Sequence, residues 1–533
     1  MKGEISGQLV NVFTRETYPA RIEWEDGIFT NVEELGHAPE HFIIPGLIDA
    51  HIHMESSFLC PSRFAELVVP RGTCATITDP HEMANVCGIA GIKYMLHDSA
   101  RIPLKCFFTA PSCVPSTQYE TSGASIGPRQ IDELFKDRRI VALGEVMNYP
   151  AVIRREKRMM AKIAVARKYG KPIDGHAPLL TGSDLRKYIS AGISTDHECT
   201  RLSEAEEKAR LGMVIHVREG SAAKDIRKLA TCKGIKCLVS DDLEPDHLLK
   251  HGHMDCLLRL AVENGIDPVD AISMASLNPS RHYGLGMDGI APRFPANFAV
   301  CDNLRFFNMG MVFIDGKVVA DNGKPLFRVR PAKPVNNFHC TEKKPEDFVI
   351  PLHKKCWRVN ALGAKDAEIH TQKVLLTPAQ AAKANIITVV ERYGHGRIGK
   401  AHATGFNIRD GAFGLSVSHD SHNIIAVGSG ADSICQVVNR IIGMKGGIAV
   451  FSRGKMHTLA LPVGGLMSDA PGEGVAHKID ELEEEIKKMG CAFRHPMGTL
   501  SFMALLVVPE IKISDKGLFD AQNFEFMHSC VEL

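Results

Sequence analysis

The chain lacks the features that mark several classes of protein. Its 63 Lys and Arg residues balance its 62 Asp and Glu residues, and a net charge of +1 provides neither a basic surface for nucleic acid nor an acidic tail. It has no run of about 18 apolar residues, so no transmembrane helix is expected. Its first residues lack the apolar run of a signal peptide, and we expect a cytoplasmic location.

A CxxC pair is also absent. The 15 cysteines are scattered, and we expect mostly buried, reduced thiols. His53-Met54-Glu55 fits the His-x-Glu of the cytidine-deaminase type, but that site also needs the thiolates of Pro-Cys-x-x-Cys, so it is excluded. With 44% apolar and 23% charged residues, the composition is that of a globular protein, and 533 residues allow about three or four domains.

Both flanks of a central region alternate apolar and polar residues. Residues 1–43 do so in short runs interrupted by Glu25-Asp26-Gly27, a hairpin-turn signal. The alternation returns at 296–319, with Asp315-Gly316 as another turn signal. We therefore expect residues 1–43 and 291–330 to form one composite β-sandwich unit.

Residues 44–290 contain short apolar runs that alternate with helical stretches such as 155–169 and 203–211. This pattern predicts an α/β fold with a parallel sheet, and its length suits a (β/α)8 barrel of the TIM type. An open doubly wound sheet is the alternative, but the Gly-rich phosphate fingerprint of that fold is missing. The runs are 42–48, 75–78, 105–110, 140–146, 172–176, 192–195, 213–217 and 236–239.

The remainder of the chain is expected to contain a separate domain. Four prolines between 331 and 351 indicate a linker or an extended surface segment. Residues 350–533 mix strands, at 386–391, 424–427 and 447–451, with a charged helix at 475–489. We expect a C-terminal α+β domain over 350–533.

Titratable residues follow the ends of the apolar runs in the central region. His51 and His53 lie on one strand, where alternate residues point the same way. Further along the chain come Glu145, His176, His197 and Asp241. The carboxyl ends of strands in a parallel barrel open onto one face, so these six side chains can hold one or two divalent cations. A His-x-His pair alone can also be structural.

Several segments resemble the adenine deaminase family of the amidohydrolase superfamily, and the similarity covers nearly the whole chain. His-x-His marks only the superfamily, whereas its combination with the TDPHE, GISTDHE and SHDSHN segments is more specific. The segments are 45–57 (PGLIDAHIHMESS), 78–86 (TDPHEMANV), 143–149 (LGEVMNY), 174–182 (DGHAPLLTG), 192–199 (GISTDHEC), 215–222 (IHVREGSA), 239–242 (VSDD) and 417–427 (VSHDSHNIIAV).

The resemblance implies a role for each of the six ligands. His51 and His53 would bind the more buried metal, Glu145 would be shared by two metals, and His176 and His197 would bind the second. Asp241 would bind the first metal and carry a proton. The family implies manganese or iron, and the superfamily implies zinc; the ligand set does not choose among them.

The implied reaction is the hydrolysis of adenine to hypoxanthine and ammonia in purine salvage. A metal-activated hydroxide would attack C6, and Asp241 would pass a proton to the leaving amine. His81 and Glu82 are the candidates for protonating a ring nitrogen, although Glu82 can also cap a helix. Asp242 is expected at the purine edge.

Other polar residues are weaker candidates for substrate contacts. His419, Asp420 and His422 are expected to contact substrate, or else to form a turn that holds its own backbone. Arg218 and Glu219 are expected to contact substrate, or else to form a structural ion pair. Ala296-Asn297 departs from the Ala-Asp of the superfamily, which puts the domain boundary there in doubt and leaves the chemistry unaffected.

Two alternative functions stay open. One is the hydrolysis of another cyclic amidine or amide, such as a different purine or a hydantoin. The other is a barrel without catalysis that serves as a binding protein. Adenine and further copies of the chain, in a homo-oligomer, are the expected partners, while nucleic acid and membranes are not expected.

Overall fold

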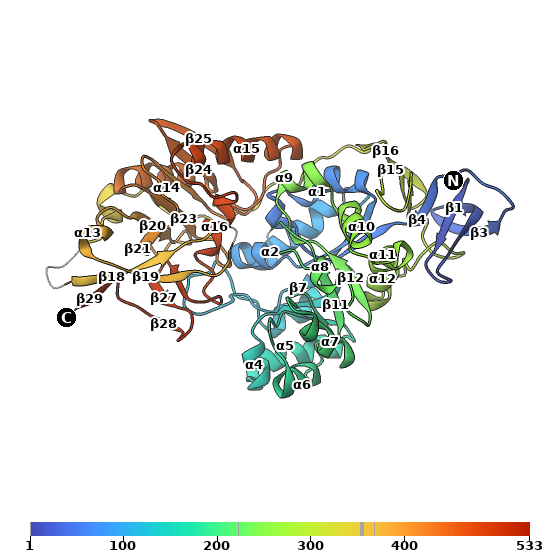
Figure 1. Cartoon of the computed structure of the whole chain (residues 1–533), viewed down its shortest axis with the longest axis horizontal. Coiled ribbons are helices and arrows are strands. Elements are labelled where there is room, and N and C mark those ends of the chain that lie inside the picture. The colour runs from blue at the N-terminus through green and yellow to red at the C-terminus, as the bar shows by residue number, and fades with distance from the viewer. Residues whose placement is uncertain (1, 222, 352–355, 367, 533) are drawn as a thin grey trace. The chain divides into compact units, whose positions relative to one another are not determined.

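The computed structural model describes residues 2–221, 223–351, 356–366 and 368–532. The chain divides into two compact units, and Figure 1 labels their elements. Unit 1 comprises Met1–His81, Met95–Cys113 and Ile126–Ala332, and unit 2 comprises Glu82–Tyr94, Val114–Ser125 and Lys333–Leu533. In the described part of the chain, no helix combines the length and apolar character needed to cross a membrane.

One sheet of unit 1 combines strands from both flanks of the central region. Its order is β17-β16-β15-β14-β4-β1-β2-β3, and β4 joins the two sets by pairing with β1 and β14. Trp24, Phe298 and Phe313 contact one another in its core. The strands are β1 (Lys2–Asn11), β2 (Glu16–Glu25), β3 (Ile28–Glu34), β4 (Phe42–Pro45), β14 (Phe298–Cys301), β15 (Met309–Ile314), β16 (Lys317–Asp321) and β17 (Lys324–Pro325).

The run at 42–48, expected as one strand, is divided between two sheets at Gly46. The Gly46 N–H donates to the Asn297 carbonyl oxygen at 3.0 Å, and a Cβ at Gly46 would lie 2.6 Å from Cys74 Sγ. Only glycine allows this approach. Asn297 accepts the Asp315 N–H with its Oδ1, a bond that the aspartate usual in the superfamily could also accept.

The central region forms a curled sheet in which every strand pair is parallel, which confirms the expected α/β class. One part has the order β13-β5-β6-β7-β8-β9 and the other β10-β11-β12. The strands are β5 (Leu47–His53), β6 (Thr73–Thr78), β7 (Lys105–Ala110), β8 (Ile140–Val146), β9 (Ile173–Gly175), β10 (Thr195–Asp196), β11 (Val214–Arg218), β12 (Lys236–Val239) and β13 (Asp241–Asp242).

Helices alternate with these strands. Every residue of β5, β6 and β8 is buried, as expected of strands with a covered sheet on both faces. The main helices are α1 (Pro61–Val68), α2 (His81–Ser99), α3 (Pro128–Leu134), α4 (Tyr149–Ile153), α5 (Lys157–Lys168), α6 (Gly182–Ser190), α7 (Leu202–Arg210), α8 (Ile226–Leu229), α9 (Pro245–His251), α10 (Met254–Glu263), α11 (Pro268–Met274) and α12 (Leu277–Tyr283).

Unit 2 contains a nine-stranded sheet, and α14 packs against β22, β23 and β24 of that sheet. Its strands are β18 (Cys356–Gly363), β19 (Gln372–Leu376), β20 (Asn385–Val390), β21 (Ile398–Thr404), β22 (Ala412–Leu415), β23 (Ile424–Gly428), β24 (Gly447–Ser452), β25 (Lys455–Ala460) and β29 (Cys530–Glu532). A separate small sheet has β26 (Ile511–Ser514), β27 (Gly517–Asp520) and β28 (Glu525–Phe526), and the helices are α13 (Pro378–Ala381), α14 (Ala431–Met444), α15 (Gly472–Lys488) and α16 (Pro496–Phe502).

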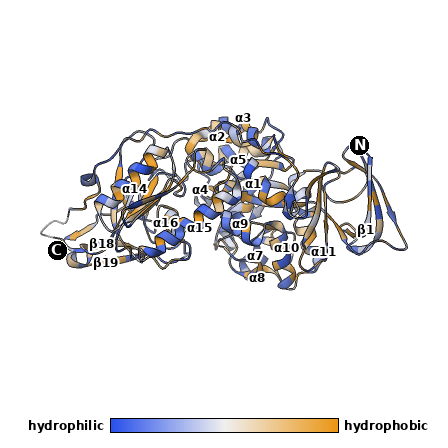
Figure 2. Cartoon of the chain, turned by 90° about the horizontal axis from the view of Figure 1, so that it is seen from above, coloured by the Kyte–Doolittle hydropathy of each residue, from blue (hydrophilic) through white to orange (hydrophobic). Residues whose placement is uncertain are grey.

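Helix α15 shows why the charged segment near 475–489 is helical. Val475, Ile479, Leu482 and Ile486 are buried at spacings of a helical stripe, while its Lys and Glu residues pair in the solvent. Both kinds of residue are visible along α15 in Figure 2.

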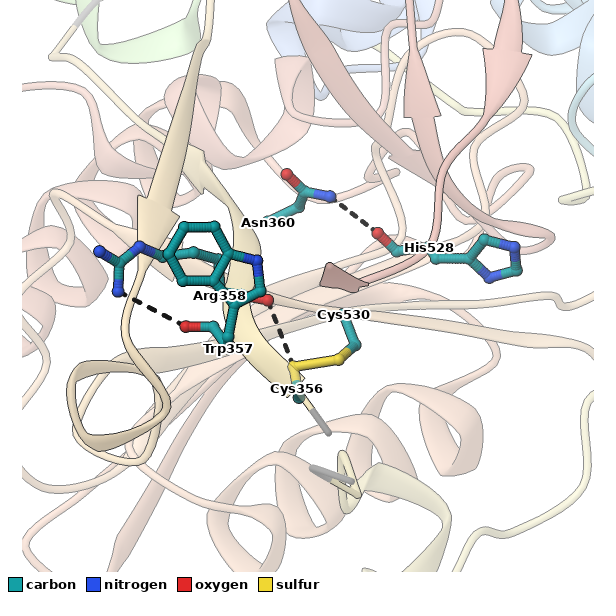
Figure 3. Close-up of a disulfide and its surroundings, with 6 residues drawn as sticks. All are labelled: Cys356, Trp357, Arg358, Asn360, His528 and Cys530. Atoms are coloured by element: carbon teal, nitrogen blue, oxygen red, sulfur yellow. Dashed lines mark hydrogen bonds between the residues drawn. A yellow bond between two sulfur atoms is a disulfide. The ribbon is translucent and has the colours of Figure 1, made fainter. Parts of the chain in front are cut away.

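Two cysteines of unit 2 are joined in a disulfide. The pairing of β18 with β29 brings Cys356 and Cys530 to a Cα separation of 5.5 Å, within disulfide range (Figure 3). Asn360 supports the same pairing by donating to the His528 carbonyl oxygen at 2.9 Å. The 13 other cysteines are free, which confirms the expectation of mostly reduced thiols.

Candidate functional site

His51 and His53 lie at the carboxyl end of β5 and face the same carboxylate. Both are buried, and their Nε2 atoms lie 3.5 Å and 3.3 Å from Asp241 Oδ1. Asp241 reaches this point because β13 pairs in parallel with β5, placing Asp241 opposite Ile52. The His53 ring is oriented by its Nδ1, which donates to the Asp79 carbonyl oxygen at 3.0 Å. Its Nε2 therefore faces the carboxylates.

Glu145, on β8, links these histidines to two more. Its Oε1 lies 3.4 Å from His53 Nε2. Its Oε2 lies 2.7 Å from His176 Nδ1 and 3.1 Å from His197 Nε2. His176 directly follows β9, and His197 directly follows β10. The structure thus brings together all six residues expected at the strand ends.

The six side chains form overlapping groups whose ligand atoms lie within 4.8 Å of one another. The groups are His51–His197–Asp241, His51–His53–Glu145 and Glu145–His176–His197. Imidazole nitrogens and carboxylate oxygens suit zinc, manganese and iron. The cluster fits a centre of one or two divalent cations.

The pKa values of the acids and histidines in the cluster are shifted by the attraction between their opposite charges. Burial opposes ionisation of Glu145, but His176 and His197 hold its pKa well below the usual range. Burial likewise opposes ionisation of Asp241, yet His51, His53 and Arg218 lower its pKa well below normal. Against the effect of burial, Glu198 and Glu145 raise the pKa of His176 to about 9. The carboxylates therefore remain ionised, and nearby positive charge stabilises them.

Three supporting residues were not singled out from the sequence. Asp79 Oδ2 accepts the Glu145 N–H at 2.9 Å. Glu198 pairs with Arg218. Asp49 Oδ2 accepts from Ser240 Oγ, and His253 Nε2 lies 2.9 Å from the same oxygen. Each of these acids lies within two residues of a candidate, which was the available signal.

Arg218 and Glu219 diverge, which removes the ion pair that was weighed between them. Arg218 donates to Asp241 Oδ2 at 3.0 Å and also contacts Glu198 and Asp225. Glu219 instead accepts the Ile226 N–H at 3.2 Å and lies near Lys224. Arg218 therefore belongs to the cluster through Asp241.

His81 and Asp242 lie beside the six-residue cluster. His81 Nδ1 is 3.3 Å from Glu145 Oε1, and its ring centroid is 4.5 Å from that of His53. Asp242 Oδ1 accepts from Ser56 Oγ, and Asp242 shares a ligand group with His53 and Asp241.

The remaining candidates belong to unit 2. Glu82, although next to His81 in the chain, has its carboxylate oxygen Oε1 3.3 Å from His419 Nδ1. His419 Nδ1 also lies 4.0 Å from Asp420 Oδ1, and the His419 and His422 ring centroids are 5.4 Å apart. These four side chains form a second polar cluster.

Comparisons with known proteins cover nearly all of the chain. A model of the amidohydrolase family matches residues 42–319, and a model of the adenine deaminase C-terminal domain matches residues 363–525. A protein named adenine deaminase from Methanosphaera stadtmanae is 45% identical over 98% of both chains. Proteins of the same name from Methanothermobacter thermautotrophicus (98% of both chains) and Sulfurovum (99% of both chains) are 44% and 43% identical.

Proposed function

The chain belongs to the amidohydrolase family and to the adenine deaminases within it, and on this premise we propose that it hydrolyses adenine to hypoxanthine and ammonia. One observation carries the proposal for this site. Four imidazoles and two carboxylates converge within a few ångströms, and they come from the ends of β5, β8, β9 and β10 and from β13. Such a donor set is suited to binding divalent cations that catalyse hydrolysis.

The arrangement of Glu145 supports a site for two cations. His51, His53 and Asp241 would hold one, His176 and His197 the other, and Glu145 both, because its two oxygens face different histidines. Manganese or iron is expected, and zinc also fits the ligands. Divalent cations in such a site supply hydroxide at neutral pH by lowering the pKa of water to about 7.

Asp241 is suited to move the proton between nucleophile and leaving amine. Arg218 holds its Oδ2 by a hydrogen bond, so Oδ1 is directed at the imidazoles of His51 and His53. A carboxylate that is already held in place loses little orientational freedom in the reaction. Proton transfer by a positioned side chain raises the reaction rate about 10²–10⁴-fold. Asp241 thus takes the proton at Oδ1 and delivers it to the amine.

His81 is the favoured donor for the ring nitrogen. Its imidazole contacts Glu145, whereas the Glu82 carboxylate contacts His419. Asp242, which follows Asp241 and accepts from Ser56, is proposed to bind the purine edge.

The strands that carry the ligands are proposed to close into a (β/α)8 barrel. Support comes from contacts of β9 with β10 and of β12 with β5, and from the pairing of β13 with β5. Closure in this order would direct every carboxyl strand end to one rim.

Ammonia release from adenine by the manganese- or iron-loaded full chain tests this function. A panel of other purines, pyrimidines and hydantoins shows whether adenine is preferred. Turnover of another ring with no turnover of adenine would replace the substrate. No turnover of any compound, with less than one ion bound per chain, would favour a binding protein.

A further inference from the structure

A second set of metal-ligating side chains lies entirely in unit 2. Glu82 is in the first turn of α2, and His419, Asp420 and His422 lie between β22 and β23. Glu82 is 1% exposed, Asp420 4% and His422 0%. Burying several ionisable groups together is costly unless they are paired or bind a metal.

The spacing of these groups matches a coordination shell. Ligand atoms of Glu82, His419 and His422 all lie within 4.8 Å of one another. Glu82 Oε1 lies 3.3 Å from His419 Nδ1. Two ligands bound tetrahedrally at about 2.0–2.1 Å from zinc are themselves about 3.3 Å apart. These two atoms can therefore share an ion without a large movement.

Asp420 supplies a fourth ligand atom near the same nitrogen of His419. Its Oδ1 lies 4.0 Å from His419 Nδ1, somewhat beyond the Glu82 oxygen. Two imidazoles and two carboxylates form a donor set that zinc and manganese accept.

Both imidazoles are held in place. The His419 ring stacks on Phe502, with centroids 4.9 Å apart and an interplanar angle of 15°. The His422 ring is oriented by its Nδ1, which accepts the Ser418 N–H at 3.3 Å.

We propose that Glu82, His419 and His422, with Asp420 as a fourth ligand, bind one divalent transition-metal ion of the zinc or manganese class. This site shares no ligand with the candidate centre of unit 1, so its occupancy can be tested whether or not the chain deaminates adenine. Because Glu82 begins the part of α2 in unit 2, a bound ion would fix the start of that helix.

Metal content of the purified full chain tests the proposal. The protein is stripped with a chelator, reloaded with Zn²⁺, desalted and measured by mass spectrometry. The His419→Ala/His422→Ala variant should bind one ion fewer per chain than the wild type. A His51→Ala/His53→Ala variant should lose ions of unit 1 and keep the ion of unit 2.

His395→Ala is the matched control. His395 Nδ1 also lies 3.3 Å from a glutamate oxygen, of Glu391, but its side chain is 54% exposed. This variant should keep the wild-type metal content. Equal metal content in the wild type and in His419→Ala/His422→Ala would overturn the proposal.

Thermal stability gives a second readout that does not need the His419→Ala/His422→Ala variant to fold. In the His51→Ala/His53→Ala background, Zn²⁺ should raise Tm through binding to the native state. The conservative Glu82→Gln substitution, added to that background, should abolish the shift. An undiminished shift would refute the assignment of Glu82 as a ligand.

Discussion

Lys208, on α7, is a fully buried cation beneath the candidate centre of unit 1. Its Nζ lies 3.1 Å from Asp196 Oδ2, 2.7 Å from Glu204 Oε1 and 2.8 Å from the Ala177 carbonyl oxygen. Ala177 directly follows His176, and Asp196 directly precedes His197. Lys208 thus connects the two segments that present these histidines.

The cost of replacing Lys208 follows from what it leaves behind. Lys208→Met preserves most of the apolar stem but strands Asp196 and Glu204, which are 0% and 3% exposed. Removing one partner of a buried ion pair destabilises a protein by about 3–5 kcal/mol. At about 1–2 °C per kcal/mol for a unit of this size, Tm should fall by roughly 3–10 °C. Displaced histidines should also weaken metal binding by about 10–100-fold.

Calorimetry of metal-free and Mn²⁺-loaded protein measures both effects. Lys187→Met is the matched control, because Lys187 makes a 2.8 Å ion pair with Asp184 whose partners are 57% and 48% exposed. Exposed pairs contribute about 0–1 kcal/mol, so that Tm should change by a few degrees at most. A Lys208→Met variant with the stability and metal affinity of the control would refute the reasoning.

The stability difference between the wild type and Lys208→Met should also depend on pH. Lys208 and neighbouring groups lower the pKa of Asp196 despite its burial. A lowered folded pKa adds stability above the unfolded value of about 3.9, and that stability is lost as pH falls through the folded pKa. The difference between wild type and Lys208→Met should therefore shrink in acid. A difference that grew below pH 4 would contradict an ionised Asp196.

Three further outcomes are expected for the centre of unit 1. Asp241→Asn should keep much of the metal but lower kcat about 10²–10⁴-fold. The control Asp246→Asn, at a surface ion pair with Lys250, should leave kcat unchanged. Equal turnover in both variants would remove Asp241 from proton transfer. Glu145→Ala should lose metal, because Glu145 contacts His53, His176 and His197; full metal content by mass spectrometry would exclude it as a ligand. Because the pKa of His176 without metal is about 9, protons compete with the cation for this imidazole. The affinity for Mn²⁺ should therefore rise from pH 6 to 9. A Mn²⁺ affinity that does not change with pH in titration calorimetry would contradict this.

The sequence predicts the parallel sheet well because most of its strands are short runs rich in apolar residues and separated by helices. The same periodicity places His51 and His53 on one face of β5, and strand direction alone predicts that Glu145 and His176 reach the same edge. The join between sheets was less predictable. A single run at 42–48 is split at Gly46 because Cys74 and Asn297 pack against that backbone, which no local pattern announces.

Contacts between distant segments account for what the sequence did not predict. Cys356 and Cys530 are 174 residues apart and meet only because the last strand pairs with β18. Similarly, the sequence presents His81 and Glu82 as one dipeptide with one role. Successive residues of a helix point in directions about 100° apart, and the structure gives one to Glu145 and the other to His419.

At two strand ends, a residue of the candidate centre is next to a residue that anchors the strand, which links stability to function. At the end of β10, His197 faces Glu145, while Asp196, one residue earlier, faces Lys208 on a covering helix. At the end of β12, Asp241 faces the imidazoles, while Ser240 donates to Asp49. At both strand ends, one position presents a ligand and its neighbour secures the strand; at Asp241 a left-handed φ of +60° turns the chain at this point. Substitutions at the securing positions should therefore reduce stability and metal affinity together, while those at the ligands should mainly affect the metal.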